Sequence, residues 1–329
     1  MNTFILIDSA NLFSRAKYAV RGDISIKTGM CLHVMFNSIK KVWNKFNGSH
    51  LVFCFEGRSW RKDYYQQYKE NRIQMRNQLS ASEQEEEKLF WEVFDEFKTF
   101  VETQTNCTVL QHKNLEADDL IAGFVQSHPN DNHVIISTDT DFYQLIAENV
   151  SHYNGVTEVL TTWENTYNAK DQPAINNKTK LPIGAPNPEW ILFEKCIRGD
   201  KSDFVFSAYP GVRLKGTKNK VGIIEAFEDR NNKGWAWNNF MMSRWIDHNQ
   251  QEHKVLDDYL RNKVLIDLTL QPEDIREKIN NTISEATNNL KNISQVGVKL
   301  MKFCNAHDLQ NVLKYIESYA YAYQARYPC

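Results

Sequence analysis

The sequence predicts an α/β fold with a mostly parallel central sheet, flanking helices and a mainly helical C-terminal domain. Residues 3–8 and 51–55 are apolar runs without alternation, which is typical of parallel strands buried on both faces. Helix-like segments alternate with such runs, as in sheets built from strand–helix–strand units. After residue 189 the pattern is helical to the end, so we expect domains at 1–195 and 196–329.

The expected elements follow from periodicity and from residues that begin or end helices. Ser80 or Ser82 would cap the third helix, because glutamates follow it closely. Residues 161–188, with several Pro and Asn, are expected to be irregular. The expected strands span residues 3–8, 51–55, 106–110 and 133–137, and the expected helices span 11–20, 29–46, 80–101 and 115–126.

Composition limits the class of protein. The chain has 329 residues, a 42% apolar share and a net charge of −2, which is compatible with two globular domains. The cysteines form no CxxC pair or zinc-ligand spacing with histidine, so we expect reduced thiols in a cytosolic protein. No apolar run is long enough for a membrane span, and the N-terminus does not resemble a signal peptide.

Carboxylates recur where apolar strands end. Asp8, Glu56 and the pair Asp139 and Asp141 follow three strands. Two further acidic motifs, LEADDL and RGDKSD, supply Glu116, Asp118, Asp119, Asp200 and Asp203. Because α/β sheets gather ligands beyond the carboxyl ends of their strands, these groups are expected around one crevice. Carboxylates this close together repel one another unless cations lie among them. Because all of these ligands are oxygens, they favour Mg²⁺ or Mn²⁺ over zinc. The pattern predicts two-metal phosphodiester chemistry.

Each acidic motif taken alone has a simpler interpretation. STDTD could be an Asx turn, Asp8 a helix cap and EADD a favourable first helical turn. Their coincidence favours metal binding. A phosphatase with a nucleophilic Asp would need DxDxT, which neither Asp8 nor Asp139 begins. The chain has no P-loop and no HExxH motif, so those chemistries are unsupported.

A basic and aromatic segment follows Glu56, at about residues 57–88. Cations neutralise phosphates and aromatic rings stack on unpaired bases, so a single-strand clamp is expected; a solvated helix is the alternative. On one helix, Arg61, Tyr65, Tyr68, Lys69 and Arg72 would share a face. The candidate cations of this segment are Arg58, Arg61, Lys62, Lys69, Arg72 and Arg76.

A second basic run follows the last acidic motif and contains Arg213, Lys215, Lys218 and Lys220. Gly211 and Gly216 would let the backbone approach phosphates. The helical stretch behind it would direct its N-terminus toward the same phosphates. We therefore expect this run to bind the phosphates of duplex DNA. The alternative is a basic surface loop without a binding role.

The ordered motifs resemble the 5′ nuclease, or flap endonuclease, superfamily, and within it the branch that contains the T-even-phage ribonuclease H. The resemblance covers about the first 205 residues with high specificity. It is carried by FILIDSANLF, CFEG, WRKDYYQQYKENR, LEADDLI, ISTDTDFYQL and IRGDKSD. The later run DHNQQEHKVLDDYLRNKVLIDLTLQP also resembles the phage branch, so we expect the likeness to span the whole chain.

The resemblance implies roles for these residues. Asp8, Glu56, Asp118 and Asp139 match ligands of a first metal; Glu116, Asp141, Asp200 and Asp203 match a second-site group, and Asp119 a supporting carboxylate. Tyr68, Lys69 and Arg72 match a helical arch that holds the 5′ strand. Two Mg²⁺ ions, replaceable by Mn²⁺, and a helix-hairpin-helix-like duplex-binding element are also implied.

Two residues depart from the family pattern. Glu56 stands where the family has Asp, but it keeps the charge and the oxygen ligands. Phe204 replaces the usual Asn after the last Asp, and the hairpin sequence also differs, so a monovalent cation site in the C-terminal domain stays open.

The resemblance implies a Mg²⁺-dependent 5′→3′ exonuclease and flap endonuclease. Such an enzyme removes RNA primers and 5′ flaps during phage DNA replication in the host cytoplasm. Its expected partners are DNA with a 5′ flap, nick or RNA primer, and also a single-stranded-DNA-binding protein and a sliding clamp. The alternatives are a catalytically weak junction-binding protein and a single-strand ribonuclease on a related acidic core.

Overall fold

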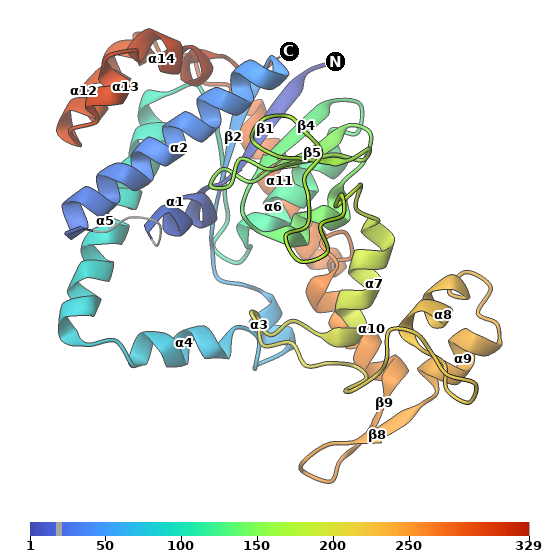
Figure 1. Ribbon diagram of the computed structural model, residues 1–329. Coiled ribbons are helices and arrows are strands. Elements are labelled where there is room, and N and C mark those ends of the chain that lie inside the picture. Colours follow the sequence, from blue (N-terminus) through green and yellow to red (C-terminus); the bar gives the residue numbers. More distant parts are fainter. Residues whose placement is uncertain (18–21, 329) are drawn as a thin grey trace. The chain divides into compact units, whose positions relative to one another are not determined.

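The computed structural model describes residues 1–17 and 22–328, which form two compact units (Figure 1). Unit 1 contains Met1–Ser59, Leu79–Pro186 and Glu273–Cys329, and unit 2 contains Trp60–Gln78 and Asn187–Pro272. This division differs from the expected boundary near residue 195. The last helices return to unit 1 because their apolar faces pack there: Ile279 of α11 (Glu273–Asn288), for example, packs over Gly123.

Unit 1 is a mixed α/β structure around a seven-stranded sheet in the order β3-β2-β1-β4-β5-β6-β7. The first five strands are parallel, and β6 and β7 add antiparallel pairings at one edge. The expected strands are therefore present, with shifts of one or two residues at their ends. The strands are β1 (Thr3–Asp8), β2 (His50–Phe55), β3 (Thr108–Gln111), β4 (Asn132–Ile136), β5 (Val150–Tyr153), β6 (Leu160–Thr161) and β7 (Thr166–Tyr167).

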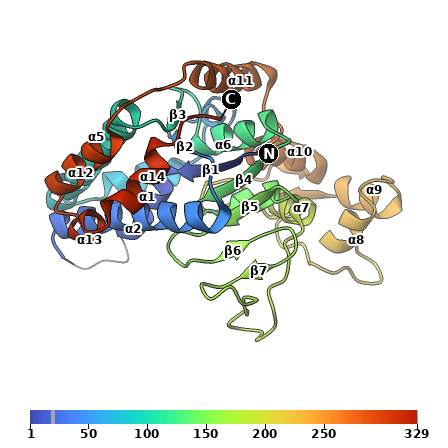
Figure 2. The same cartoon turned by 90° about the horizontal axis from the view of Figure 1, so that it is seen from above.

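Helices cover both faces of this sheet (Figure 2). On one face, α2 (Ile24–Phe46) and α5 (Ala81–Gln104) share a large buried core with Ile5 and Ile7 of β1. On the other face lie α6 (Ala117–Ser127) and α11, where Phe124 contacts Phe4. The remaining helices of unit 1 are α1 (Ser9–Lys17), α12 (Val296–Ala306), α13 (Gln310–Leu313) and α14 (Ile316–Gln324).

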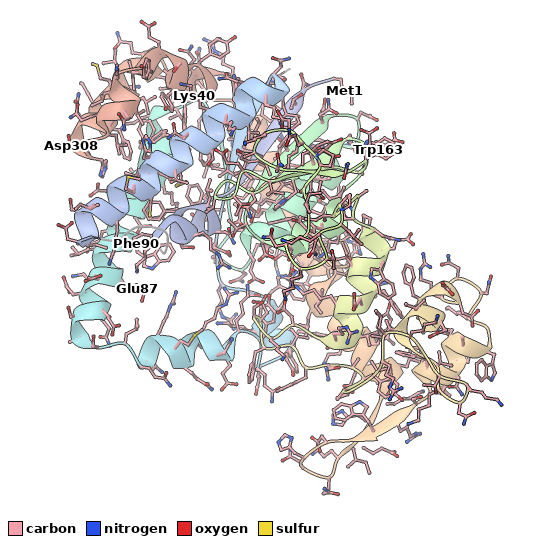
Figure 3. The ribbon with its side chains drawn as sticks, viewed as in Figure 1. Met1, Lys40, Glu87, Phe90, Trp163 and Asp308 are labelled. Atoms are coloured by element: carbon pink, nitrogen blue, oxygen red, sulfur yellow. The ribbon has the colours of Figure 1, made fainter. Side chains whose placement is uncertain are left out.

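Local sequence explains where α5 begins. Ser80 and Glu83 form a capping box, in which each side chain bonds the backbone N–H of the other residue. Of the two candidate caps, the structure selects Ser80. Phe90, labelled in Figure 3, lies on the buried side of α5, with its ring centroid 4.5 Å from that of Phe13.

Unit 2 is mainly helical, with one small antiparallel hairpin. Its core joins Phe193 and Ile197 of α7 to Ile223, Met241 and Val255. The elements are α3 (Arg61–Tyr64), α4 (Glu70–Asn77), α7 (Pro188–Arg198), α8 (Ile223–Glu228), α9 (Trp235–Met241), β8 (Arg244–Ile246), β9 (Glu252–Lys254) and α10 (Val255–Ile266).

Several expectations need correction or lie outside the described residues. The basic segment is not one helix: α3 and α4 are separated by a break at Lys69, whose φ is 56°. The expected helix at 11–20 is present to Lys17, and the rest lies outside the described residues. Among residues 1–17 and 22–328, no helix is long and apolar enough to cross a membrane.

Candidate active site and nucleic-acid interface

Three of the predicted carboxylate positions follow adjacent strands of unit 1. The order β2-β1-β4 places the C-terminal ends of these strands next to one another, with Asp8 opposite Cys54 and Ile7 opposite Ile136. Asp8 is the last residue of β1, Glu56 follows β2, and Asp139 lies three residues beyond β4. The strand topology therefore brings these acidic groups to one edge of the sheet.

Hydrogen bonds fix the Asp8 and Asp139 segments to each other. Ser137 donates its hydroxyl to Asp8 Oδ2 at 2.7 Å, and its Oγ accepts the backbone N–H of Asp139 at 3.0 Å. Asn11 Oδ1 accepts both the N–H and the hydroxyl of Thr138. Asp139 Oδ1 accepts the N–H of Asp141, an Asx turn that opens the 3₁₀ helix η1 (Thr140–Leu145).

The N-terminus of α6 is the second source of carboxylates. Glu56 Oε2 accepts the N–H of Ala117 at 3.2 Å, and Glu116 accepts the hydroxyl of Ser59. Asp119 is fully buried, and its Oδ2 accepts the N–H of Glu116 in a capping box. Asp119 therefore stabilises the start of α6.

Buried side chains near these groups respond to their charge. Burial, reinforced by the charges of Asp8, Asp118 and Glu56, raises the pKa of the Cys54 thiol well above its usual value. Three carboxylates from three segments thus act on one thiol. Burial lowers the pKa of His152 to about 4, although the charge of Asp139 opposes this shift.

The predicted ligand atoms of unit 1 are of the kind that binds a hard divalent cation. All the predicted ligands in unit 1 offer carboxylate oxygens, which Mg²⁺ and Mn²⁺ prefer. In the described part of the chain, however, no three His, Cys, Asp or Glu side chains form a group that could hold a metal ion as they stand.

In unit 2, Asp203 is the centre of a polar cluster with the basic segment. Its Oδ1 accepts Nη2 of Arg72 at 2.6 Å, and its Oδ2 accepts the hydroxyl of Tyr68 at 3.0 Å. Lys69 Nζ lies 3.5 Å from Oδ2, and the Lys69 N–H donates to the carbonyl of Asp203. The structure brings these three predicted arch residues to one predicted metal ligand.

Asp200 has a different set of partners. Lys195 Nζ lies 2.6 Å from its Oδ2, and Ser202 donates both its N–H and its hydroxyl to Oδ1. Burial would raise the pKa of Asp200, but the Lys195 charge and these hydrogen bonds outweigh it and lower that pKa. Asp200 is therefore held as an anion.

Arg61 does not fit the predicted role in nucleic-acid binding. It is 1% exposed, its Nε donates to the carbonyl of Leu265 at 2.8 Å, and its guanidinium lies over the ring of Trp60. The expected shared face of Arg61 and Arg72 is wrong, because the chain turns at Lys69 between α3 and α4. Arg58, Arg72 and Arg76 are exposed, and Lys62 is half-buried.

The second basic run is exposed, but its geometry also corrects an expectation. Arg213, Lys215, Lys218 and Lys220 all face solvent in a loop closed by pairing of Thr217 with Lys220. The N-terminal amides of α8 are already bonded within unit 2. Glu225 accepts the N–H groups of Gly216 and Gly222, and Ile223 donates to the carbonyl of Arg213. Phosphates therefore cannot use this helix N-terminus as predicted.

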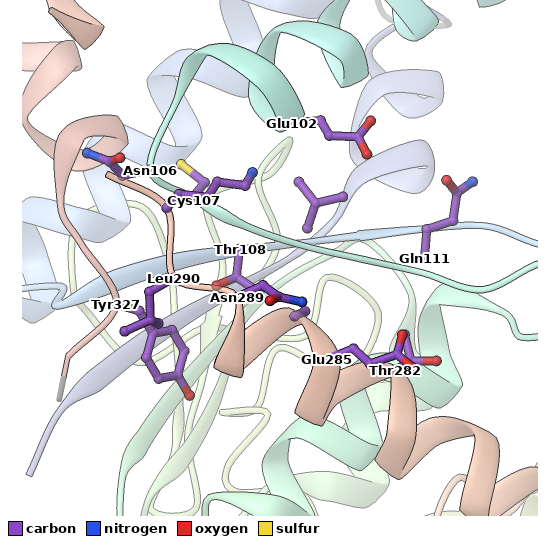
Figure 4. Close-up of a pocket in the computed structure, with 13 residues that line it drawn as sticks. Glu102, Asn106, Cys107, Thr108, Gln111, Thr282, Glu285, Asn289, Leu290 and Tyr327 are labelled. Carbon is purple, nitrogen blue, oxygen red and sulfur yellow. The ribbon is translucent and has the colours of Figure 1, made fainter. Parts of the chain in front are cut away.

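A separate cavity of about 270 Å³ lies at the β3 edge of unit 1 (Figure 4). The predicted metal ligands are not among its lining residues. Its walls combine β3, the end of α5, the end of α11 and Tyr327, and burial lowers the pKa of Lys291 in it. The lining mixes one cation with two carboxylates and several amides, and it offers no concentrated charge for a phosphate.

Sequence reasoning missed the residues that hold the carboxylates in place. Ser137 bonds Asp8 and Ser59 bonds Glu116 in unit 1, Asn11 bonds Thr138 beside Asp139, and Lys195 bonds Asp200 in unit 2. Ser137 and Asn11 lie within the quoted motifs, so their positions were a usable signal. Lys195 lies one helical turn before Gly199, which ends α7, and the sequence contains no pattern that indicates its pairing with Asp200.

Comparison with known proteins gives the family. The family described as "5'-3' exonuclease, N-terminal resolvase-like domain" matches residues 3–177, more than half of the chain. The chain belongs to the 5′ nuclease, or flap endonuclease, superfamily. The residues matched by the family, 3–177, include Asp8, Glu56, Glu116, Asp139 and Asp141 of unit 1.

Relatives of this 5′ nuclease include bacterial proteins. A 5'-3' exonuclease of Mycoplasmopsis pulmonis is 27% identical over 230 residues, covering 68% of each chain. The flap endonuclease Xni of Shewanella woodyi is 29% identical over 236 residues, covering 70% of this chain and 81% of the relative.

Solved structures agree on the fold of this 5′ nuclease. The T5 D15 protein, co-crystallised with metal ions, has a TM-score of 0.58 at 18% identity, covering 87% of this chain and 99% of that chain. The T5 5'-exonuclease with divalent zinc ions bound has a TM-score of 0.59 at the same identity and coverage.

Proposed function

We propose that this chain is a Mg²⁺-dependent 5′→3′ exonuclease and flap endonuclease that removes RNA primers and 5′ flaps during phage DNA replication. The observation that carries the proposal is the placement of Asp8, Glu56 and Asp139 at the carboxyl ends of three adjacent parallel strands, in a member of the 5′ nuclease superfamily. The metal ions present in the T5 structures support the same chemistry.

The residues divide into roles by motif. Asp8, Glu56, Asp118 and Asp139 would hold the first ion, Glu116 and Asp141 a second, and Asp119 would keep the α6 start in place. Asp200 and Asp203 keep the ligand roles that their motif implies. Bound Mg²⁺ would supply Lewis acidity for the attacking water and for the phosphate oxygens. Mn²⁺ would substitute, since it prefers the same oxygen donors.

The protein's own groups prepare this chemistry. Ser137 orients Asp8 and the backbone of Asp139, and the N–H of Ala117 orients Glu56, so hydrogen bonds hold these ligands in position. Lys69 and Arg72 would stabilise negative charge on the scissile phosphate once they leave Asp203. Tyr68 would position them through the same carboxylate.

Phosphate contacts would position the nucleic acid. The exposed Arg58, Arg76, Arg213, Lys215, Lys218 and Lys220, together with the half-buried Lys62, are the proposed contacts. Backbone contacts carry no base information, so selection would depend on the structure of the junction. A single-stranded-DNA-binding protein and a sliding clamp are proposed partners on the basis of the resemblance.

End-labelled substrates test the proposal. We expect cleavage of 5′ flaps, nicked duplexes and RNA-primed duplexes in Mg²⁺ and none in EDTA. Release of products from the 5′ end, with slower cleavage of single strands, would agree with a junction nuclease. Binding of flaps without cleavage in any divalent cation would favour a junction-binding protein, and preferential cleavage of single-stranded RNA would favour a ribonuclease.

A further inference from the structure

Two aromatic side chains lie at the surface of unit 2 immediately after Asp203. Phe206 is 49% exposed and Phe204 is partly exposed, and their ring centroids are 5.2 Å apart. The ring planes are inclined at 56°, so neither ring covers the face of the other completely. Exposed apolar patches often mark interaction sites, and the two rings together form such a patch.

The backbone at Phe204 is strained. Its φ is 58°, in the left-handed region that bulky residues rarely adopt. Asp200 and Val205 exchange both backbone hydrogen bonds, at 2.8 and 2.7 Å, and so close the loop that carries Phe204. Such strain persists only where the surroundings enforce it, and it is common at functional sites.

The loop is fixed on both sides of the aromatic pair. The carbonyl of Asp203 accepts the N–H of Lys69, and the carbonyl of Phe206 accepts Nδ2 of Asn262 at 2.7 Å. The rings therefore project from a held backbone, which lowers the entropy lost when they bind a flat partner.

The charges around the pair indicate the class of partner. Asp203, one residue before Phe204, is bonded by Arg72 and lies beside Lys69, and Lys201 is exposed in the same loop. Cations beside exposed aromatic rings are the combination that binds a single strand, since phosphates contact the cations and bases stack on the rings.

We propose that Phe204 and Phe206 form a stacking site for one unpaired nucleobase of the bound strand. The inference rests on the proposed function, because it assumes a nucleic-acid substrate. It assigns to this loop a contact with a base, in addition to the phosphate contacts of Lys69 and Arg72. Stacking is tolerant of sequence because every base has a π face, so the site would recognise an unpaired base without reading its identity.

A double-mutant cycle tests this inference by removing the aromatic rings from the protein and single bases from the DNA, separately and together. The protein variants are Phe204→Leu, Phe206→Leu and the double variant, which keep apolar volume but lose the aromatic faces. The DNA is a 5′ flap in which a tetrahydrofuran abasic unit replaces one nucleotide at a time, in the flap and at the first base pair. Affinity is measured by fluorescence anisotropy in EDTA, so that no turnover occurs.

We expect the double variant to bind the intact flap roughly tenfold more weakly than the wild type does. At one abasic position the wild type should bind about tenfold more weakly than it binds the intact flap. The double variant should bind that abasic flap as tightly as it binds the intact flap. Phe206→Tyr should bind like the wild type because it keeps the ring. Trp235→Leu, which removes an exposed aromatic elsewhere in unit 2, should have no effect.

Phe204→Gly separates stacking from misfolding. Glycine relieves the positive φ, so this variant should melt at the same temperature as the wild type or higher, while still losing affinity. Full affinity in the Leu variants, or equal abasic losses in wild type and double variant at every position, would overturn the inference. If the wild type neither binds a flap in EDTA nor cleaves one in Mg²⁺, the proposed function itself fails.

Discussion

Asp203 Oδ1 accepts a hydrogen bond from Arg72 Nη2 at 2.6 Å, so a predicted metal ligand holds a predicted phosphate-binding cation. Tyr68 and Lys69 contact the other oxygen of the same carboxylate. The cluster keeps two cations beside an anion while no phosphate is bound. Phosphate would therefore compete with Asp203 for Lys69 and Arg72.

Asp203→Asn should strengthen metal-free binding of a single-stranded oligonucleotide by about three- to tenfold. The change removes one anion that phosphate would otherwise compete with for Lys69 and Arg72, so the salt dependence should steepen by roughly one. Anisotropy across a salt series in EDTA measures both quantities. Asp257→Asn, which removes an exposed carboxylate of the same unit, is the matched control. Unchanged affinity in Asp203→Asn would show that this carboxylate does not restrain the cations.

Arg61→Ala should reduce stability rather than affinity. The buried guanidinium bonds the Leu265 carbonyl, and its loss should lower the free energy of unfolding by about 2–4 kcal/mol. Lys62→Ala, next to it and partly exposed, should cost less than about 0.5 kcal/mol. Urea unfolding of both variants provides the comparison. A stable Arg61→Ala protein with weak DNA binding would restore the original phosphate role.

Neutralising Lys215 and Lys218 together should flatten the salt dependence of nicked-duplex binding by about two. Both side chains are exposed in the loop before α8, so no loss of stability is expected. The matched control is the double variant Lys178→Gln and Lys180→Gln, which neutralises two exposed lysines of unit 1. Cleavage of a flap with a duplex stem should suffer more than cleavage of single strands. An unchanged slope would place the duplex contact elsewhere.

Acid should destabilise the protein through His50. Burial lowers its pKa from 6.5 to about 4, and its Nε2 accepts the N–H of Thr108, so the folded state favours the neutral ring. This contribution is fully present above pH 6.5 and is lost as the pH falls toward 4, by up to about 3 kcal/mol. His50→Gln keeps an acceptor but does not titrate. Unfolding measured at pH 7 and pH 4.5 should differ less in that variant; an equal difference would exclude His50 as a cause.

Much of unit 1 could be predicted because local patterns agree with the tertiary structure. The apolar runs ending at Asp8 and before Asp139 are buried strands, and Ser80 caps α5 as its following glutamate indicates. The unit boundary could not be predicted, because the spacing of Ile275, Ile279 and Ile283 shows an apolar helix face without showing what covers it.

The basic segment misled sequence reasoning for a similar reason. The spacing of Arg61 and Arg72 fits one helix, but the chain turns at Lys69, whose N–H bonds the carbonyl of Asp203 far along the chain. Arg61 is buried by contact with Leu265, a partner 204 residues away. Contacts of such long range leave no periodic signal in the sequence.

The central claim is that the carboxylates beyond β1, β2 and β4 hold the ions for phosphodiester hydrolysis, and Asp139→Asn combined with Asp141→Asn tests it most directly. Single-turnover cleavage of a 5′ flap in Mg²⁺ should fall by at least about 1,000-fold, because anionic ligands are lost. Flap binding in EDTA should stay equal or tighten, since the basic surfaces are intact. Cleavage at a near-normal rate by this double variant would contradict the account.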